Sequence, residues 1–180
     1  MRWPRSLRYL YLACCSRPAC ERPLYVEMRR RPISRILEIG LGDGRRALRL
    51  IEIARLFRPE QPLDYSVIDP FEMARGGLSV KAAHQMLARS GARYRLIPGE
   101  PLATLAAMAN SLLGQQLVIV ASPADPAART PLWLYLPRLL ADDALLYLSD
   151  ASGPGGRCVL RPVSRDELQA RATAARRRAA

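Results

Sequence analysis

The chain has 180 residues, of which 49% are hydrophobic and 24% charged, and its formal net charge is +12. This length and composition are those of one globular domain, and they exclude a disordered or fibrous chain. The positive charge alone would suit nucleic acid. Lys81, however, is the only lysine among the 28 basic residues, so a GC-rich coding bias explains the charge equally well, and nucleic acid is not the favoured partner.

The first 16 residues are expected to form an N-terminal arm, either loosely ordered or a short helix. Its apolar run, Tyr9–Cys15, follows Arg8 and spans only seven residues. That is the lower edge of a signal-peptide core and far below the ~20 residues of a membrane span, so we predict a cytoplasmic chain without a membrane span. Cys14, Cys15 and Cys20 have no histidine nearby, which argues against a zinc site or a disulfide framework.

Residues 17–180 alternate between apolar runs typical of buried strands and segments with helical periodicity, which predicts a single domain. The expected strands are 36–39, 65–68, 94–97, 117–121 and 144–148, with a short edge strand at 158–160. The expected helices are 16–31 with Ser16 as N-cap, 45–57, 79–91, 102–113, 133–140, and a last one that begins at a capping box of Ser164 and Glu167. This alternation predicts an α/β fold with a parallel sheet of about five strands, helices on both faces and one additional edge strand.

The first strand ends in a glycine-rich turn, Glu38-Ile39-Gly40-Leu41-Gly42-Asp43-Gly44. Glycine accepts positive φ and lets a ligand approach the backbone amides at the start of the next helix. The spacing is G-x-G-x-G, because Arg45 stands where a dinucleotide fingerprint needs its last glycine, and the chain has no G-x-x-x-x-G-K-[ST] phosphate loop. Glu38 would repel a pyrophosphate, so the turn favours a cationic ligand with free hydroxyls.

The stretch Leu37–Gly44 resembles the first motif of class I S-adenosylmethionine-dependent methyltransferases, which have a Rossmann-like fold. Asp69, which ends the second strand 29 residues after Gly40, is similar to the acid that holds the ribose hydroxyls in that family. Pro70 and Phe71 occupy places where the family often packs the adenine, and Gly99-Glu100 matches the position near the adenine amine. The resemblance therefore implies S-adenosylmethionine as cofactor, bound by Glu38, Gly40, Gly42, Asp43, Gly44, Asp69, Phe71 and Glu100.

The part of the chain that would hold the methyl acceptor matches the family less completely. The spacing of the glycine turn, Asp69 and Asp150 resembles that of small-molecule O-methyltransferases, which implies a small-molecule acceptor. Ala121-Ser122 stands where those enzymes carry an aspartate, so we expect no metal site, and the candidate catalytic residues are Asp150 and His84. Only 158–160 represents the family's last two strands, and the exposed sheet edge that this truncated end leaves could support a homodimer.

Two other functions stay open. The first is a catalytically degenerate methyltransferase-like domain that binds an adenosyl ligand, or none, and serves as an interaction module. The second is an RNA methyltransferase. Both would use the arginine runs Arg29–Arg31 and Arg176–Arg178 as contacts, although such runs at helix ends more often face solvent or complement the helix dipole.

Overall fold

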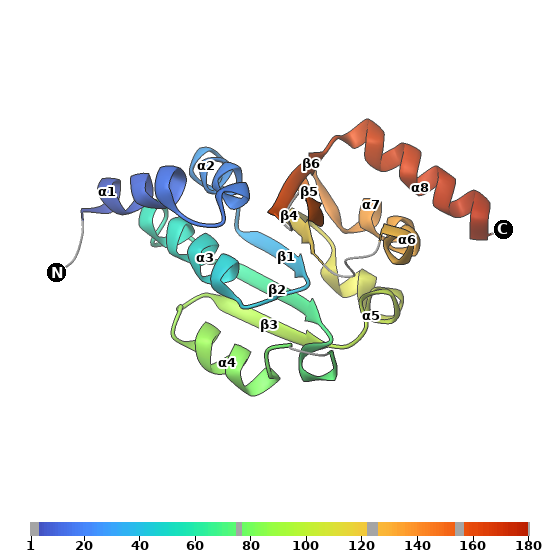
Figure 1. Ribbon diagram of the computed structural model, residues 1–180, viewed down its shortest axis with the longest axis horizontal. Coiled ribbons are helices and arrows are strands. Elements are labelled where there is room, and N and C mark those ends of the chain that lie inside the picture. The colour runs from blue at the N-terminus through green and yellow to red at the C-terminus, as the bar shows by residue number, and fades with distance from the viewer. Residues whose placement is uncertain (1–3, 75–76, 122–125, 154–156, 180) are drawn as a thin grey trace.

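A computed structural model describes residues 4–74, 77–121, 126–153 and 157–179 of the chain, and for residues 126, 150–153, 157–158 and 179 it describes the backbone alone. Six strands form one sheet in the order β3-β2-β1-β4-β5-β6. The strands are β1 (Arg35–Ile39), β2 (Asp64–Asp69), β3 (Arg93–Pro98), β4 (Gln115–Val120), β5 (Leu140–Gly153) and β6 (Arg157–Val163) (Figure 1). The first five are parallel and β6 runs antiparallel to β5.

The strand order reverses between β1 and β4, which are hydrogen-bonded neighbours in the centre of the sheet. From β1 the chain winds outward through β2 to β3, and it then returns to β4 and winds the other way. In open α/β sheets the crevice for a ligand lies at such a reversal, beyond the carboxyl ends of the strands. The topology therefore places the turn after β1 beside Ala121, which directly follows β4 and whose N–H donates to the carbonyl of Ile39 at 2.7 Å.

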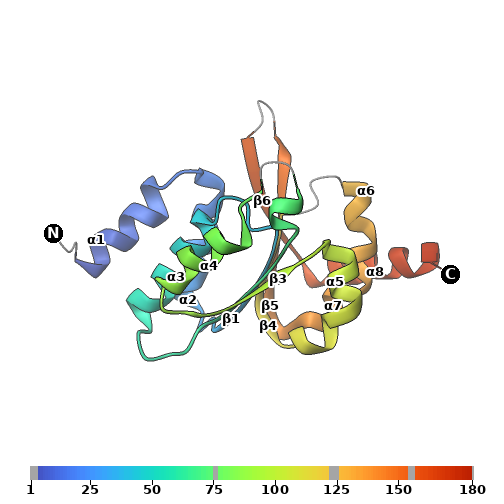
Figure 2. The same cartoon turned by 90° about the horizontal axis from the view of Figure 1, so that it is seen from below.

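Helices cover both faces of the sheet (Figures 1 and 2). On one face α2 (Arg22–Arg30), α3 (Arg45–Phe57) and α4 (Val80–Ala88) pack on a cluster that includes Ile36 of β1. On the other face α5 (Pro101–Met108), α7 (Leu136–Leu139) and α8 (Arg165–Ala179) pack on a cluster that includes Leu37. Because neighbouring residues of β1 enter opposite clusters, the strand is apolar throughout, as the sequence predicts.

The N-terminal residues form a short helix, α1 (Arg5–Leu10), which continues as a π-helical turn at Tyr11–Cys15. Tyr9 and Leu12 of this segment are buried, and the Tyr9 ring meets the Phe57 ring edge-on at 5.1 Å between centroids. No helix in the described ranges is both long and apolar enough to cross a membrane.

The expectation that Ser16 caps a helix is wrong. The Ser16 hydroxyl donates to the carbonyl of Leu12, and α2 begins only at Arg22, after a 3₁₀ turn at Ala19–Glu21. Pro23 fits the first turn of α2, where a backbone N–H is not needed.

The expected helix at 133–140 is wrong in extent. Thr130–Leu134 is a 3₁₀ turn, α7 is limited to Leu136–Leu139, and Leu140 already belongs to β5. The chain also has a one-turn helix, α6 (Pro126–Arg129), just before it. Pro137 lacks the N–H that a continuous helix through this segment would need.

The parallel strands and the additional edge strand are confirmed, but the last two strands are longer than expected. β5 and β6 pair from Leu146↔Val163 to Gly153↔Arg157, with an irregularity between Asp150 and Gly153. The additional residues of each strand are held in extended conformation by hydrogen bonds to the other strand. Because this pairing is a tertiary contact, the apolar pattern of either segment alone does not predict it.

Candidate functional site

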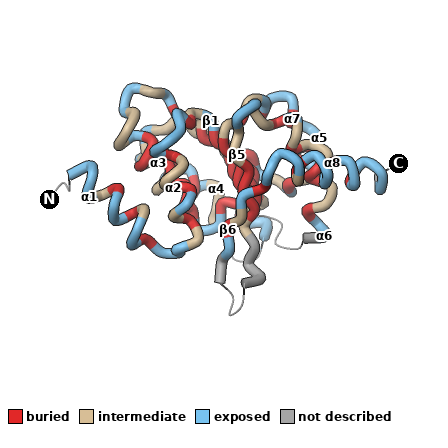
Figure 3. Tube along the Cα trace, turned by 90° about the horizontal axis from the view of Figure 1, so that it is seen from above, coloured by how far each residue is buried: buried red, intermediate tan, exposed pale blue. Residues whose placement is uncertain are grey.

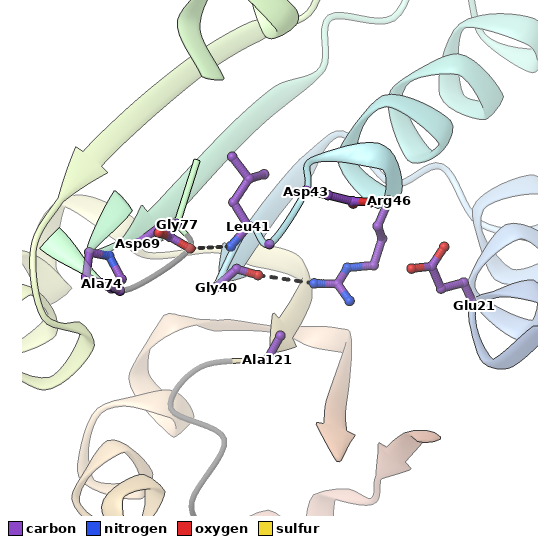
Figure 4. Close-up of a pocket in the computed structure, with 11 residues that line it drawn as sticks. Glu21, Gly40, Leu41, Asp43, Arg46, Asp69, Ala74, Gly77 and Ala121 are labelled. Atoms are coloured by element: carbon purple, nitrogen blue, oxygen red, sulfur yellow. Dashed lines mark hydrogen bonds between the residues drawn. The ribbon is translucent and has the colours of Figure 1, made fainter. Parts of the chain in front are cut away.

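A cavity of about 350 Å³ lies at the reversal of strand order (Figure 4). It is bounded by the turn after β1, the start of α3, the segments after β2 and β4, and the 3₁₀ turn that precedes α2. The described residues that line it are Glu21, Gly40, Leu41, Gly42, Asp43, Arg46, Asp69, Pro70, Ala74, Gly77 and Ala121.

The glycine turn exposes backbone to this cavity. Gly40, Gly42 and Gly44 have φ angles of 93°, 63° and 72°, in the left-handed region that favours glycine. A Cβ built on Gly42 meets no atom within 4 Å, whereas one on Gly44 would lie 2.1 Å from Cε of Met86. Gly42 thus leaves open space next to the cavity, and Gly44 allows α3 to approach α4.

Asp69 joins the loops after β1 and β2. Its Oδ2 accepts from the backbone N–H of Leu41 at 2.7 Å, and its Oδ1 accepts from that of Phe71 at 2.6 Å. The residue is 9% exposed and lines the cavity. Since a carboxylate has about four lone-pair sites, it can still accept hydrogen bonds from a ligand.

Glu38 lies behind the glycine turn in a buried ion pair. It is 0% exposed, and its carboxylate accepts from Arg46 Nε at 2.6 Å and from the Tyr65 hydroxyl at 2.6 Å. Burial, and then the Glu38 carboxylate, raise the pKa of Tyr65, so the phenol keeps its proton and donates. Burial disfavours the charge on Arg46, but the Glu38 carboxylate outweighs this effect and raises the pKa of Arg46. Burial raises the pKa of Glu38 as well, although the Arg46 guanidinium and the Tyr65 hydroxyl oppose this effect.

Arg46 connects this buried carboxylate to the cavity. It is 8% exposed and lines the cavity, and its Nη2 donates to the carbonyl of Gly40 at 3.2 Å. Among the described residues its Nη1 has no hydrogen-bond acceptor. An almost buried guanidinium with a spare donor at a cavity is suited to an anionic group of a ligand.

Glu21 faces Arg46 across the cavity (Figure 4). It is 6% exposed, and its carboxylate accepts from the Tyr25 hydroxyl at 2.6 Å and from Arg49 Nη1 at 3.2 Å. Within the described chain it forms an ion pair with Arg49 and none with Arg46. A negative and a positive side chain thus lie on opposite sides of a gap.

Several predicted site residues occupy other positions. Phe71 is 1% exposed in the core below the cavity, with a positive φ of 50°, and Pro70 lines the cavity in its place. Asp43 lines the cavity and is exposed. Glu100 is exposed and caps α5, where it accepts from the N–H of Ala103 at 2.9 Å.

Of the two candidate catalytic residues, the structure describes the side chain of His84 but not that of Asp150. His84 lies on α4 within 2.8 Å of the Tyr94 hydroxyl, and it lines a separate hollow together with Val80, Lys81, Tyr94 and Leu96. The side chain of Asp150 is outside the described part of the structure. In the described side chains no group of three His, Cys, Asp or Glu residues is arranged to hold a metal ion.

Sequence reasoning missed Glu21 and Arg46. Arg46 had a usable signal, because it lies in the first turn of the helix after the glycine turn and eight residues beyond a strand acid that would need a buried partner. Glu21 had none. It lies 19 residues before Gly40 and reaches the cavity only through the packing of α2 against α3.

The sequence matches no protein-family model, and no curated protein matches it. Solved structures match its fold. A TehB-like SAM-dependent methyltransferase from Corynebacterium glutamicum aligns with a TM-score of 0.54 and 17% identity, over 95% of this chain and 79% of that one. An SAH-bound methyltransferase from Podospora anserina gives a TM-score of 0.53 and 18% identity, over 98% of this chain and 75% of that one.

A third similar structure is the O-methyltransferase TomG from Streptomyces achromogenes, in complex with SAM. Its TM-score is 0.53 at 17% identity, over 98% of this chain and 76% of that one. The chain therefore has the Rossmann-like fold of the class I methyltransferases.

Proposed function

We propose that the cavity binds S-adenosylmethionine and that the chain transfers its methyl group to a small-molecule acceptor. The observation that carries the proposal is the charge of the cavity. Its described lining has three acidic side chains, Glu21, Asp43 and Asp69, and one basic side chain, Arg46, in a chain of net charge +12. A locally acidic cavity beside an exposed glycine turn fits a cationic ligand that carries hydroxyl groups.

The gap between Arg46 and Glu21 suits the amino-acid end of this ligand. Arg46 would hold the carboxylate through its spare Nη1 donor, and Glu21 would accept from the ammonium group. Glu38 contributes indirectly, because it fixes the guanidinium of Arg46.

The remaining predicted residues receive roles according to their positions. The carboxylate of Asp69 would accept from the ribose hydroxyls, and the backbone of Gly40 and Gly42 would lie against the chain that joins the two ends of the ligand. Pro70 would face the adenine, with Phe71 supporting the loop from below. Glu100 would contribute weakly from the rim, because an exposed carboxylate remains solvated.

When bound, S-adenosylmethionine supplies a methyl group that its sulfonium already activates, so the chain needs mainly to orient the acceptor. The small side chain of Ala121 leaves space beside the glycine turn for that acceptor. We keep Asp150, at the carboxyl end of the sheet, as the candidate base. His84 is the weaker candidate because it lines another hollow. A cytoplasmic location and a homodimer through the sheet edge remain predictions.

Calorimetry with two ligands tests the binding proposal. S-adenosylhomocysteine contains the amino-acid end and 5′-methylthioadenosine lacks it. We expect the wild type to prefer S-adenosylhomocysteine, and we expect Arg46→Met and Glu21→Gln to lose most of that preference while they still bind 5′-methylthioadenosine. Arg55→Met, on the same helix but bonded to Ser90, and Glu52→Gln, which loses the pair with Arg8, are the matched controls.

A folded wild type without affinity for either ligand would overturn the proposed function. Unchanged preference in both variants would overturn only the roles of Arg46 and Glu21. Binding without product from any acceptor in a methyl-transfer screen would favour the degenerate module, and salt-sensitive RNA binding accompanied by RNA methylation would favour the third function.

A further inference from the structure

The outer face of the N-terminal helical segment carries three exposed apolar side chains, Leu7, Leu10 and Tyr11, which we call the apolar stripe. Their exposed fractions are 50%, 49% and 45%. Their spacing of three and one residues places them on one side of the helix, while Tyr9 and Leu12 on the other side are buried. Figure 3 shows buried and exposed positions alternating along this helix.

Exposed large apolar side chains are concentrated in the apolar stripe and are isolated elsewhere on the described surface. The other large apolar side chains that are exposed in the described ranges are Met73, Leu113 and Val159. They lie on three different segments: the 3₁₀ turn after β2, the end of the turn after α5, and β6. Single exposed apolar residues of this kind are ordinary, whereas a contiguous set on one helix indicates a contact surface.

The surroundings of the stripe are positively charged. Arg5 and Arg17, which lie on either side of it along the chain, are exposed. The guanidinium carbon of Arg8 lies 5.7 Å from the centre of the Tyr11 ring. Residues 4–20 contain no acidic side chain. The nearby carboxylate of Glu52 is occupied by Arg8 at 2.6 and 2.9 Å.

The helix is also held firmly to the body of the protein. The two hydrogen bonds between Arg8 and Glu52 and the edge-on contact of Tyr9 with Phe57 fix its inner face on α3. The stripe is thus displayed without a need to fold on contact, so binding would not carry the entropy cost of ordering a disordered segment.

We propose that the apolar stripe docks on an anionic lipid surface, with the helix lying in the interfacial plane. The leucine and tyrosine side chains would enter the boundary between headgroups and acyl chains, and Arg5 and Arg17 would meet the lipid phosphates. The charge pattern favours this surface over an apolar protein groove, because exposed arginines lie on both sides of the stripe along the chain and residues 4–20 have no acidic side chain, which suits an extended negative partner. The proposal does not depend on methyl transfer.

Vesicle flotation tests the proposal, with vesicles of phosphatidylcholine alone or mixed with phosphatidylglycerol. The intact chain should float with the anionic vesicles, and the bound fraction should fall as salt is raised. The double variant Leu7→Ser/Leu10→Ser should lower the partition coefficient by about tenfold, since it removes apolar surface, and Arg5→Gln/Arg17→Gln should weaken the preference for anionic lipid. Leu113→Ser, with 47% exposure at a distant site, is the matched control and should float like the wild type.

Circular dichroism melting of each variant establishes that it is folded. Failure of the wild type to float at low salt would overturn the proposal, and so would flotation that Leu7→Ser/Leu10→Ser leaves unchanged. A dimer in light scattering that this double variant converts to a monomer, with no flotation of the wild type, would show that a second copy covers the stripe and would also overturn it.

Discussion

Carboxylates in two regions of the molecule have opposite surroundings. Beneath the glycine turn, Glu38 is 0% exposed and Asp69 is 9% exposed, and each accepts two hydrogen bonds from groups that the fold holds in place. At the starts of α5 and α8, Glu100 and Glu167 are partly or fully exposed. Glu100 accepts from a backbone N–H of the first helical turn, and Glu167 accepts from partly exposed arginine side chains. The same chemical group should therefore contribute far more to stability and binding in the first region than in the second.

The largest effect is expected from Glu38→Ala. Removing this carboxylate leaves the buried guanidinium of Arg46 without its counter-ion, which costs ~3–5 kcal/mol. Urea denaturation should show the loss as a lower free energy of unfolding. Glu52→Ala, which breaks the partly exposed pair with Arg8, is the control and should cost less than ~1 kcal/mol. Equal losses in the two variants would contradict the comparison.

Asp69→Ala should have the next largest effect, this time on both stability and binding. It leaves the N–H groups of Leu41 and Phe71 without their acceptor, at about 2 kcal/mol, and it should weaken the binding of S-adenosylhomocysteine by about 100-fold. Glu100→Ala removes only a helix cap, so we expect about 1 kcal/mol and roughly a threefold loss of affinity. Chemical denaturation and calorimetry measure the two quantities. Similar affinities of the two variants would show that Asp69 does not contact the ligand.

The smallest effect is expected from Glu167→Gln and depends on pH. The hydrogen bond from Arg161, with a further contribution from Arg171, lowers the pKa of Glu167 below its ordinary value. A lowered pKa in the folded state means that this stabilisation is complete above the unfolded pKa of about 4.3 and is lost as the pH falls through the folded pKa. The variant should thus be less stable than the wild type by under ~1 kcal/mol at pH 7, and the difference should shrink at pH 3. A difference that grows on acidification would contradict this account.

The sequence predicts the central part of the fold because local signals and tertiary environment agree there. The apolar run of β1, the three glycines and the acid that ends β2 each identify a position that the structure confirms. Where a proline or the pairing of two strands determines the bounds of an element, the pattern of apolar residues does not predict those bounds. Pro137 interrupts the expected helix, and the mutual pairing of β5 and β6 extends both strands. At Ser164 the predicted capping box is half formed, since Ser164 accepts from the N–H of Glu167 while the Glu167 side chain contacts arginines.

The cavity was less predictable than the fold, for a physical reason. Glycine turns and strand-end acids are local features, so Gly40, Gly42 and Asp69 could be found in the sequence. Glu21 enters the cavity only because Arg49 and the α2–α3 contact hold its segment there. Phe71 was expected at the cavity and is instead in the core, because a bulky apolar side chain gains more from full burial than from a rim position.

The two hydrogen bonds of Asp69 have a kinetic consequence. They fasten the turn after β1 to the loop after β2 before any ligand is present, so this wall of the cavity is preorganised. The entropy cost of ordering these loops is part of the free energy of folding, so ligand binding does not carry that cost. A ligand that contacts this wall should therefore bind in a single kinetic phase whose observed rate rises linearly with ligand concentration. Differences in affinity between ligands should then arise mainly from their dissociation rate constants.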